Sequence, residues 1–216
     1  MLQYLIFLLI TYLSPTLLKQ KDHLRNFCDD IEYFGKYFQT VALDFWGTGK
    51  SDRLRDWTRE WWSEAAEDTA NLIKHLASES AHIIGCSGGT AVAMLLAAKY
   101  PEKVRSIIAD SELTDYEYDD MLRLCVETRN IPDKAQIDFW KKAHGEDWFE
   151  VVQKDNDVML DVAANGHVFK DMFDDISFEI DESGTPYWIC PVKKYNIGLF
   201  GGVTIGRVVI CKAVTG

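Results

Sequence analysis

The sequence predicts an α/β fold, in which a doubly wound, mostly parallel sheet carries helices and a helical cap. Two observations lead to this prediction. Along residues 4–109, short apolar runs of strand length alternate with longer runs whose apolar residues recur every three or four positions. In addition, Asp44, Ser87 and Asp110 each come just after a strand-like run. Functional side chains gather at the carboxyl ends of parallel strands, so we expect these three residues along one sheet edge.

Four apolar runs predict the strands of this sheet. The first, YLIFLLI, has no polar alternation, which is typical of a strand that is covered on both faces. The later runs are shorter, and each ends at a polar or glycine-rich segment. The predicted strands are residues 4–10, 40–43, 82–85 and 104–109.

Three helices are predicted between these strands. Residues 56–76 give the clearest pattern, because apolar side chains recur at steps of three and four and form one face. Residues 21–38 show helical spacing on a polar background. The alanine-rich stretch 91–100 is predicted to end before Pro101.

Changes in composition divide the chain into three predicted parts. Residues 1–114 form the core, which contains the sheet. Residues 115–175 are rich in charged and aromatic side chains at helical spacing, which predicts a helical cap or insertion. Residues 176–216 form the remainder of the core or an atypical C-terminal segment. In this last part, the strand-like runs are residues 178–180, 187–192 and 203–212.

The composition excludes several classes of function. The 216 residues carry a formal net charge of −11, and such an acidic surface repels the phosphates of nucleic acids. The five cysteines are widely spaced and form no CxxC pair, so neither a zinc site nor a disulfide framework is predicted. Scattered single cysteines are typical of a reducing cytosol. No cofactor or metal is expected.

The apolar N-terminal stretch, residues 2–18, has two interpretations. It could belong to a secreted or membrane-associated protein. However, no Lys or Arg precedes it, no small-residue cleavage site follows it, and Pro15 interrupts it. It is also short for a membrane span of about 20 residues. We therefore predict a buried strand, a turn at Ser14–Pro15 and a cytoplasmic protein.

The residues with the most chemical information are Gly85-Cys86-Ser87-Gly88-Gly89, which match G-x-S-x-G between a predicted strand and a predicted helix. In this layout a sharp turn strains the serine and exposes its hydroxyl at the sheet edge, and the flanking glycines allow the turn to pack. The next helix directs its N-terminal N–H groups at the site, so the Gly88 N–H is a candidate oxyanion donor. Cys86 is interpreted as a small buried apolar residue rather than a second nucleophile.

An ordinary glycine-rich turn or a phosphate-binding loop is the alternative interpretation of these five residues. No Gly-Lys-Ser/Thr follows the glycines, and the GxGxxG pattern of dinucleotide sites is absent there. The strand before Ser87 and the helix after it favour the nucleophile turn.

Three segments together resemble the α/β-hydrolase family. Residues 44–52 (DFWGTGKSD) resemble its D-x-R-G-x-G-x-S loop, with Trp46 in place of the usual arginine. Residues 81–89 (AHIIGCSGG) resemble its strand and nucleophile turn, and residues 100–109 (YPEKVRSIIA) resemble its Y-P-x-x-V segment and next strand. The resemblance covers about residues 30–115. It implies a mostly parallel sheet with a helical cap, and hydrolysis of an ester or related bond.

The resemblance is incomplete at both ends of the chain. The His-Gly pair that usually follows an early strand of the family is absent. Cys190-Pro191-Val192 resembles the segment that leads to the family's acidic residue, but no Asp or Glu follows it. The family's histidine comes last in the chain, whereas no histidine follows His167 here.

Asp110 and His167 are therefore the candidate acid and base. Asp110 lies at the end of the strand after the turn, although it could instead be a solvated carboxylate that caps a turn. His167 precedes the C-P-V segment, and a surface histidine of the cap is its alternative interpretation. His144 is a further candidate base, or a histidine at the end of a helix.

These observations lead to two hypotheses of function. The first is a serine hydrolase that acts on a small-molecule, ester-like substrate through Ser87. The second is a catalytically degenerate or truncated domain that keeps the fold and the turn and has a binding role or no activity. Trp57, Trp61 and Trp62 could line an acyl pocket, although their helical spacing favours core packing.

The C-terminal segment breaks from the rest of the chain in composition. After Glu182 it contains no acidic residue and no histidine, and its four charged residues are all basic. We expect it to pack poorly and to be cleaved by proteases after Lys193 or Arg207.

Overall fold

The computed structural model describes residues 3–9, 27–76, 78–110, 118–169, 177–180, 186–189, 195–199 and 208–213. Several predictions lie outside these residues: the Ser14–Pro15 turn, the Cys190-Pro191-Val192 segment, and the protease sites at Lys193 and Arg207. The side chain of Asp110 also lies outside the described part, although its backbone belongs to a strand.

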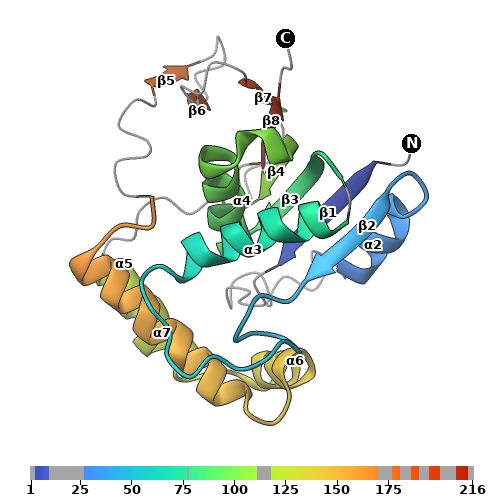
Figure 1. Ribbon diagram of the computed structural model, residues 1–216. Coiled ribbons are helices and arrows are strands. Elements are labelled where there is room, and N and C mark those ends of the chain that lie inside the picture. Colours follow the sequence, from blue (N-terminus) through green and yellow to red (C-terminus); the bar gives the residue numbers. More distant parts are fainter. Residues whose placement is uncertain are drawn as a thin grey trace.

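A six-stranded sheet organises the described part of the chain, with the strand order β2-β1-β3-β4-β8-β7 (Figure 1). The first four strands in this order are parallel, and β8 and β7 run antiparallel to their neighbours. The predicted mostly parallel sheet is therefore confirmed. The parallel strands are β1 (Tyr4–Leu9), β2 (Gln39–Leu43), β3 (Ala81–Cys86) and β4 (Val104–Asp110).

Each of these four strands agrees with its predicted range to within one residue at either end. Strand β1 lies between β2 and β3, and its residues 5–8 are all buried. This burial explains why the first apolar run has no polar alternation, because both faces of the strand are covered.

Helix α4 (Gly88–Lys99) packs against β1, β3 and β4, and α3 (Trp61–His75) packs beside it. Helix α4 starts three residues earlier than predicted, because its two N-terminal glycines continue directly from the Ser87 turn. Helix α3 starts five residues later than predicted, because residues 56–58 are irregular and residues 59–60 form a turn. Two further helices are described between β1 and β4: α2 (Phe27–Phe34) and the short 3₁₀ helix η1 (Pro101–Lys103).

Among the described residues, four helical segments follow β4, and we call them the cap helices. They lie together below the sheet in Figure 1. Their helical character is as predicted, whereas the division of the chain into three parts stays a prediction. The cap helices are α5 (Tyr118–Leu122), the π-helix η2 (Arg123–Arg129), α6 (Lys134–His144) and α7 (Trp148–Asn165).

The start of α6 is determined by a local sequence motif, a capping box. Asp133 Oδ1 accepts from the Gln136 N–H at 2.9 Å, and Gln136 Oε1 accepts from the Asp133 N–H at 3.1 Å. This capping box satisfies two N–H groups that a helix start would otherwise leave unpaired. The helix ends at Gly145.

The chain between β2 and α3 runs along α7 before it returns to the sheet (Figure 1). Lys154 Nζ donates to the Leu54 carbonyl at 3.1 Å, and Arg59 Nη1 donates to the Asn165 carbonyl at 2.8 Å. This connection therefore joins the carboxyl edge of the sheet to the cap helices.

The C-terminal strands complete the described fold. Strand β8 (Val208–Ala213) pairs antiparallel with β4 and with β7 (Tyr195–Leu199). Strands β5 (Ser177–Ile180) and β6 (Pro186–Ile189) form a separate antiparallel pair. Strand β7 is absent from the sequence-based prediction. The protease sensitivity of this segment stays a prediction.

Candidate active site

Ser87 lies between the end of β3 and the start of α4, at the carboxyl edge of the sheet. Its backbone has φ 54° and ψ −125°, and Ser87 is the one non-glycine residue with a positive φ in the described ranges. A positive φ crowds the Cβ of an L-residue and costs roughly 1–2 kcal/mol. Such a conformation persists only where the surrounding packing enforces it. The backbone at Ser87 thus has the strained form that the G-x-S-x-G pattern predicts.

Two glycines provide that packing. A Cβ on Gly89 would lie 1.9 Å from the carbonyl oxygen of Leu8 in β1, and a Cβ on Gly85 would lie 2.5 Å from the carbonyl oxygen of Gly89. Both distances are far below van der Waals contact, so any larger residue would push the turn away from the sheet. Residues at positions −2 and +2 from Ser87 must therefore be glycine for this turn to form.

The N-terminus of α4 begins directly after Ser87. The Thr90 N–H donates to the Ser87 carbonyl at 2.8 Å, and Thr90 Oγ1 donates to the Gly85 carbonyl at 3.1 Å. These bonds hold the turn against the first turn of a 12-residue helix. A helix N-terminus favours negative charge, which is the property that an oxyanion site requires. The role of the Gly88 N–H as an oxyanion donor stays a prediction.

The end of β4 lies beside the end of β3. Asp110 is the register partner of Cys86, so the Asp110 backbone is one residue from Ser87 on the neighbouring strand. Cys86 is 7% exposed, which confirms that it is a buried residue. The predicted edge therefore contains Asp44, Ser87 and Asp110 at the ends of β2, β3 and β4.

His167 is an exposed residue of the irregular segment after α7. Gly166, on one side of it, lies against the Arg59 side chain, and Val168, on the other side, is buried in the core. The structure therefore places His167 near the start of α3. The pairing of His167 with Ser87 stays a prediction.

His144 occupies the end of α6, as the helix-end interpretation expects, and is only 4% exposed. Its Nδ1 accepts a hydrogen bond from the Gly49 N–H at 2.9 Å. Burial and the nearby Arg53 guanidinium lower the pKa of His144 to about 4. His144 is thus a neutral, buried hydrogen-bond acceptor for the loop after β2, and this geometry does not direct Nδ1 at Ser87.

We call residues 44–53 the β2 loop. Its fold depends on Asp44, whose Oδ2 accepts from the Lys50 N–H at 3.0 Å and whose carbonyl accepts from Ser51 Oγ at 2.6 Å. Gly49 has φ +53°, and a Cβ there would lie 2.2 Å from Asp44 Cγ. These contacts explain the D-x-x-G-x-G-x-S spacing as the sequence of a tight turn rather than as a set of catalytic groups.

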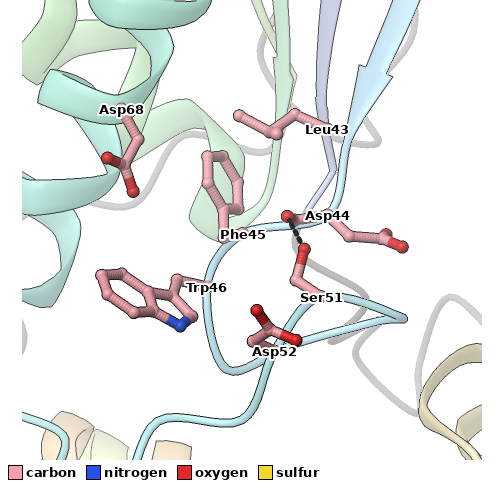
Figure 2. A pocket seen from close by; sticks show the side chains of 7 residues that line it. All are labelled: Leu43, Asp44, Phe45, Trp46, Ser51, Asp52 and Asp68. Carbon is pink, nitrogen blue, oxygen red and sulfur yellow. Dashed lines mark hydrogen bonds between the residues drawn. The ribbon is translucent and has the colours of Figure 1, made fainter.

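The β2 loop also lines a pocket of about 270 Å³ (Figure 2). Asp68 of α3 completes the lining, beside the rings of Phe45 and Trp46. Burial and, to a smaller degree, Glu67 raise the pKa of Asp68. Asp68 was not predicted as a site residue, because it lies on the polar face of α3 and no motif marks it.

The tryptophans of this region form a packed aromatic cluster. Trp57 and Trp61 stack with a centroid distance of 5.2 Å, and Trp61 meets Phe45 edge to face at 5.7 Å. Trp61 Nε1 donates to the Trp46 carbonyl at 3.1 Å. Trp61 and Trp62 are each 2% exposed. The core-packing interpretation therefore holds for these two residues.

No group of three or more His, Cys, Asp or Glu side chains within the described ranges could hold a metal ion. Of the helices that the structure describes, none combines the length and the apolar composition needed to cross a bilayer.

Comparison with known proteins gives a family match. The model of a family described as the alpha/beta hydrolase fold matches residues 22–130, which is just over half of the chain. The matched range contains the β2 loop, the Ser87 turn and β4.

Two curated proteins match a shorter stretch. The 2-(acetamidomethylene)succinate hydrolase of Mesorhizobium japonicum is 40% identical over 72 residues, which are 33% of this chain and 25% of that protein. The serine hydrolase BPHL of Mus musculus is 35% identical over 74 residues, which are 34% of this chain and 25% of that protein. Each alignment thus spans about a quarter of the curated relative.

Among solved structures, NosK from Streptomyces actuosus is similar, with a TM-score of 0.57 and 19% sequence identity. The alignment covers 76% of this chain and 66% of NosK. At this identity the likeness concerns the fold alone.

Proposed function

Because the chain belongs to the alpha/beta hydrolase fold family, we propose that it is a hydrolase in which Ser87 attacks a small ester or related acyl compound. The observation that carries the proposal is the strained backbone of Ser87, with φ 54°, at the N-terminus of α4. This conformation has a steric cost that a structural turn does not require. In the nucleophile turn of this fold, such a conformation exposes the serine hydroxyl at the edge of the sheet, where it can reach a substrate. The two curated relatives, both named as hydrolases, add support.

The proposed reaction has two stages. Ser87 Oγ attacks the carbonyl carbon while a base removes its proton, and the resulting oxyanion accepts a hydrogen bond from the Gly88 N–H. The tetrahedral intermediate expels the alcohol, which takes the proton, and leaves an acyl group on Ser87. Water then attacks the acyl carbonyl by the same route and releases the acid.

Asp110 and His167 are the acid and base that we propose for this reaction. Asp110 is supported by its register, since it pairs with Cys86 next to the nucleophile. His167 is supported by its exposure and by its place in the segment that follows α7. A neutral imidazole can accept a serine proton. The Nδ1 of His144 instead accepts from the Gly49 N–H. A cytoplasmic location is proposed from the scattered cysteines.

A fluorophosphonate probe tests whether Ser87 is an activated nucleophile. We expect one probe adduct on the wild-type protein, measured by intact mass, and no adduct on Ser87→Ala. The matched control is Ser63→Ala, because Ser63 lies on α3 and its hydroxyl contacts Lys99. It should label at the wild-type rate. Labelling that persists in Ser87→Ala, or no labelling of the folded wild type, would contradict the proposal.

The same assay tests the base. We expect His167→Ala to slow labelling by roughly 100-fold or more, since a positioned base typically contributes 10²–10⁴-fold. His75→Ala is the control, because His75 is an exposed residue of the last turn of α3. An equal labelling rate for the two variants would remove His167 from the mechanism.

A second candidate function is binding without hydrolysis. It applies if neither Asp110 nor His167 acts on Ser87. In that case the chain keeps the Ser87 turn as part of the fold, but Ser87 does not act as a nucleophile. The absence of probe labelling on a folded wild-type protein would select this second function.

A further inference from the structure

Three contacts join the β2 loop to the junction of α6 and α7. The Gly49 N–H donates to His144 Nδ1 at 2.9 Å. Arg53 donates to both carboxylate oxygens of Asp147, from Nε at 2.6 Å and from Nη2 at 2.9 Å. Arg53 Nη2 also donates to the His144 carbonyl. Arg53 Nη1 donates to the Gly49 carbonyl at 3.0 Å, so one guanidinium contacts both the β2 loop and the junction of α6 and α7.

The hydrogen bond from Gly49 requires one protonation state of His144. A ring nitrogen that accepts an N–H must itself carry no proton, so the neutral ring holds its proton on Nε2. A protonated ring has N–H donors at both nitrogens. Nδ1–H would then face the Gly49 N–H across 2.9 Å, and two donors at this distance cannot bond.

We propose that His144, Arg53 and Asp147 form an acid-sensitive latch, which holds the cap helices α6 and α7 on the β2 loop and loosens when His144 is protonated. Protonation removes the Gly49 contact and places a positive charge next to the Arg53 guanidinium. The contacts from Arg53 to Asp147 and to the His144 carbonyl remain in place.

The charged groups around His144 come from three elements. Asp44 and Arg53 belong to the β2 loop, Asp147 to the turn between α6 and α7, and Arg129 to η2. Burial is the largest influence and lowers the pKa of His144. Arg53 and Arg129 also lower it, while Asp44 and Asp147 raise it, and the resulting pKa is about 4.

The carboxyl of Asp147 is harder to protonate than an ordinary aspartate. The hydrogen bonds from Arg53 hold the pKa of Asp147 below its ordinary value. Of these two groups, His144 therefore takes up its proton first on acidification. Since the β2 loop lines the pocket of Figure 2 with residues 44–46 and 51–52, its release changes that pocket. This inference goes beyond hydrolysis and holds whether or not Ser87 is reactive.

Hydrogen exchange at the Gly49 amide tests the latch. The protection factor, which corrects for the intrinsic effect of pH, is measured by NMR from about pH 7 to about pH 4, with the β3 amides as internal reference. The ring ¹⁵N shifts of His144 are recorded in parallel. We expect an Nε2–H tautomer at neutral pH. We also expect Gly49 protection to fall at least about tenfold as the ring titrates, while β3 stays protected.

Two outcomes of the wild-type titration would overturn the latch. One is Gly49 protection that does not change while the His144 ring takes up its proton. The other is simultaneous loss of protection in β3, because the whole fold and not the junction would then be opening.

A pair of variants isolates the residue responsible. His144→Asn keeps a side-chain acceptor near the Nδ1 position but does not titrate, so it should hold Gly49 protection at acid pH. His75→Asn, on the exposed face of α3, should release Gly49 like the wild type. Release in both variants to the same extent would assign the effect to another group. If His144→Asn does not fold, the wild-type titration decides alone.

Discussion

Arg53 and Asp147 are 94 positions apart in the sequence, yet the guanidinium of one meets the carboxylate of the other through two parallel hydrogen bonds. The side chains are 33% and 43% exposed, so solvent screens part of the attraction. The main effect of this pair is geometric. The planar guanidinium presents its N–H groups as a rigid fork, which fixes the direction from which the β2 loop meets the cap helices.

Arg53→Lys should weaken this junction although the charge is kept. An ammonium group cannot reproduce the fork, which also supplies hydrogen bonds to the carbonyls of Gly49 and His144. We expect a loss of about 1 kcal/mol in the free energy of unfolding, measured by urea denaturation. Arg55→Lys, on the same exposed connection, should change it by less than about 0.5 kcal/mol. Equal effects would mean that the fork has no structural role.

Gly89→Ala should disrupt the Ser87 turn. The new methyl group would lie 1.9 Å from the Leu8 carbonyl oxygen, and the central strand β1 cannot retreat without losing its pairing with β2 and β3. We expect a cost of roughly 3 kcal/mol or more in unfolding free energy. The control is Gly166→Ala, where the methyl group would come no closer than 3.4 Å to Arg59 and should have a small effect. A mild effect of Gly89→Ala would mean that the turn is not held by this contact.

The parallel sheet could be predicted from the sequence because its signals are local. Continuous apolar runs mark buried strands, and the run of residues 4–10 has the expected burial at positions 5–8. The Ser87 turn was predictable for a similar reason, since both glycines that it needs lie within two positions of the serine.

The latch could not be predicted, because its partners are far apart and carry no pattern. Gly49 and His144 are separated by 95 positions, and nothing near His144 indicates a partner on the β2 loop. Strand β7 was missed for a related reason, since its pairing with β8 depends on a chain reversal rather than on local periodicity. Asp68 has no local sequence signal either, because it becomes a pocket residue only through the position of α3 beside the β2 loop.

Acidification should lower stability through His144. Its pKa in the folded protein is about 4, below the ordinary value of about 6.5, so the unfolded chain binds more protons between these values. The free energy of unfolding therefore falls as the pH drops through this window, by up to about 3 kcal/mol from this residue. Urea unfolding of wild type and His144→Asn at several pH values gives the difference directly. A constant difference across the window would contradict the assignment.

Arg129 of η2 and Asp155 of α7 form an ion pair at 2.6 Å. Their side chains are only 4% and 2% exposed. Arg129→Met leaves the carboxylate of Asp155, whose pKa burial already raises, without its partner. We expect a loss of about 3–5 kcal/mol in unfolding free energy.

Adding Asp155→Leu to Arg129→Met removes the stranded charge and should recover at least about 2 kcal/mol, because two apolar side chains have no desolvation cost to offset. Urea unfolding of both single variants and the double variant forms a complete cycle, from which the coupling between the two residues is obtained. If the losses simply add, the two groups do not stabilise the cap helices as a pair. Arg129 would then act mainly through contacts with other residues, such as the bond from Nη1 to Met159 Sδ at 3.0 Å.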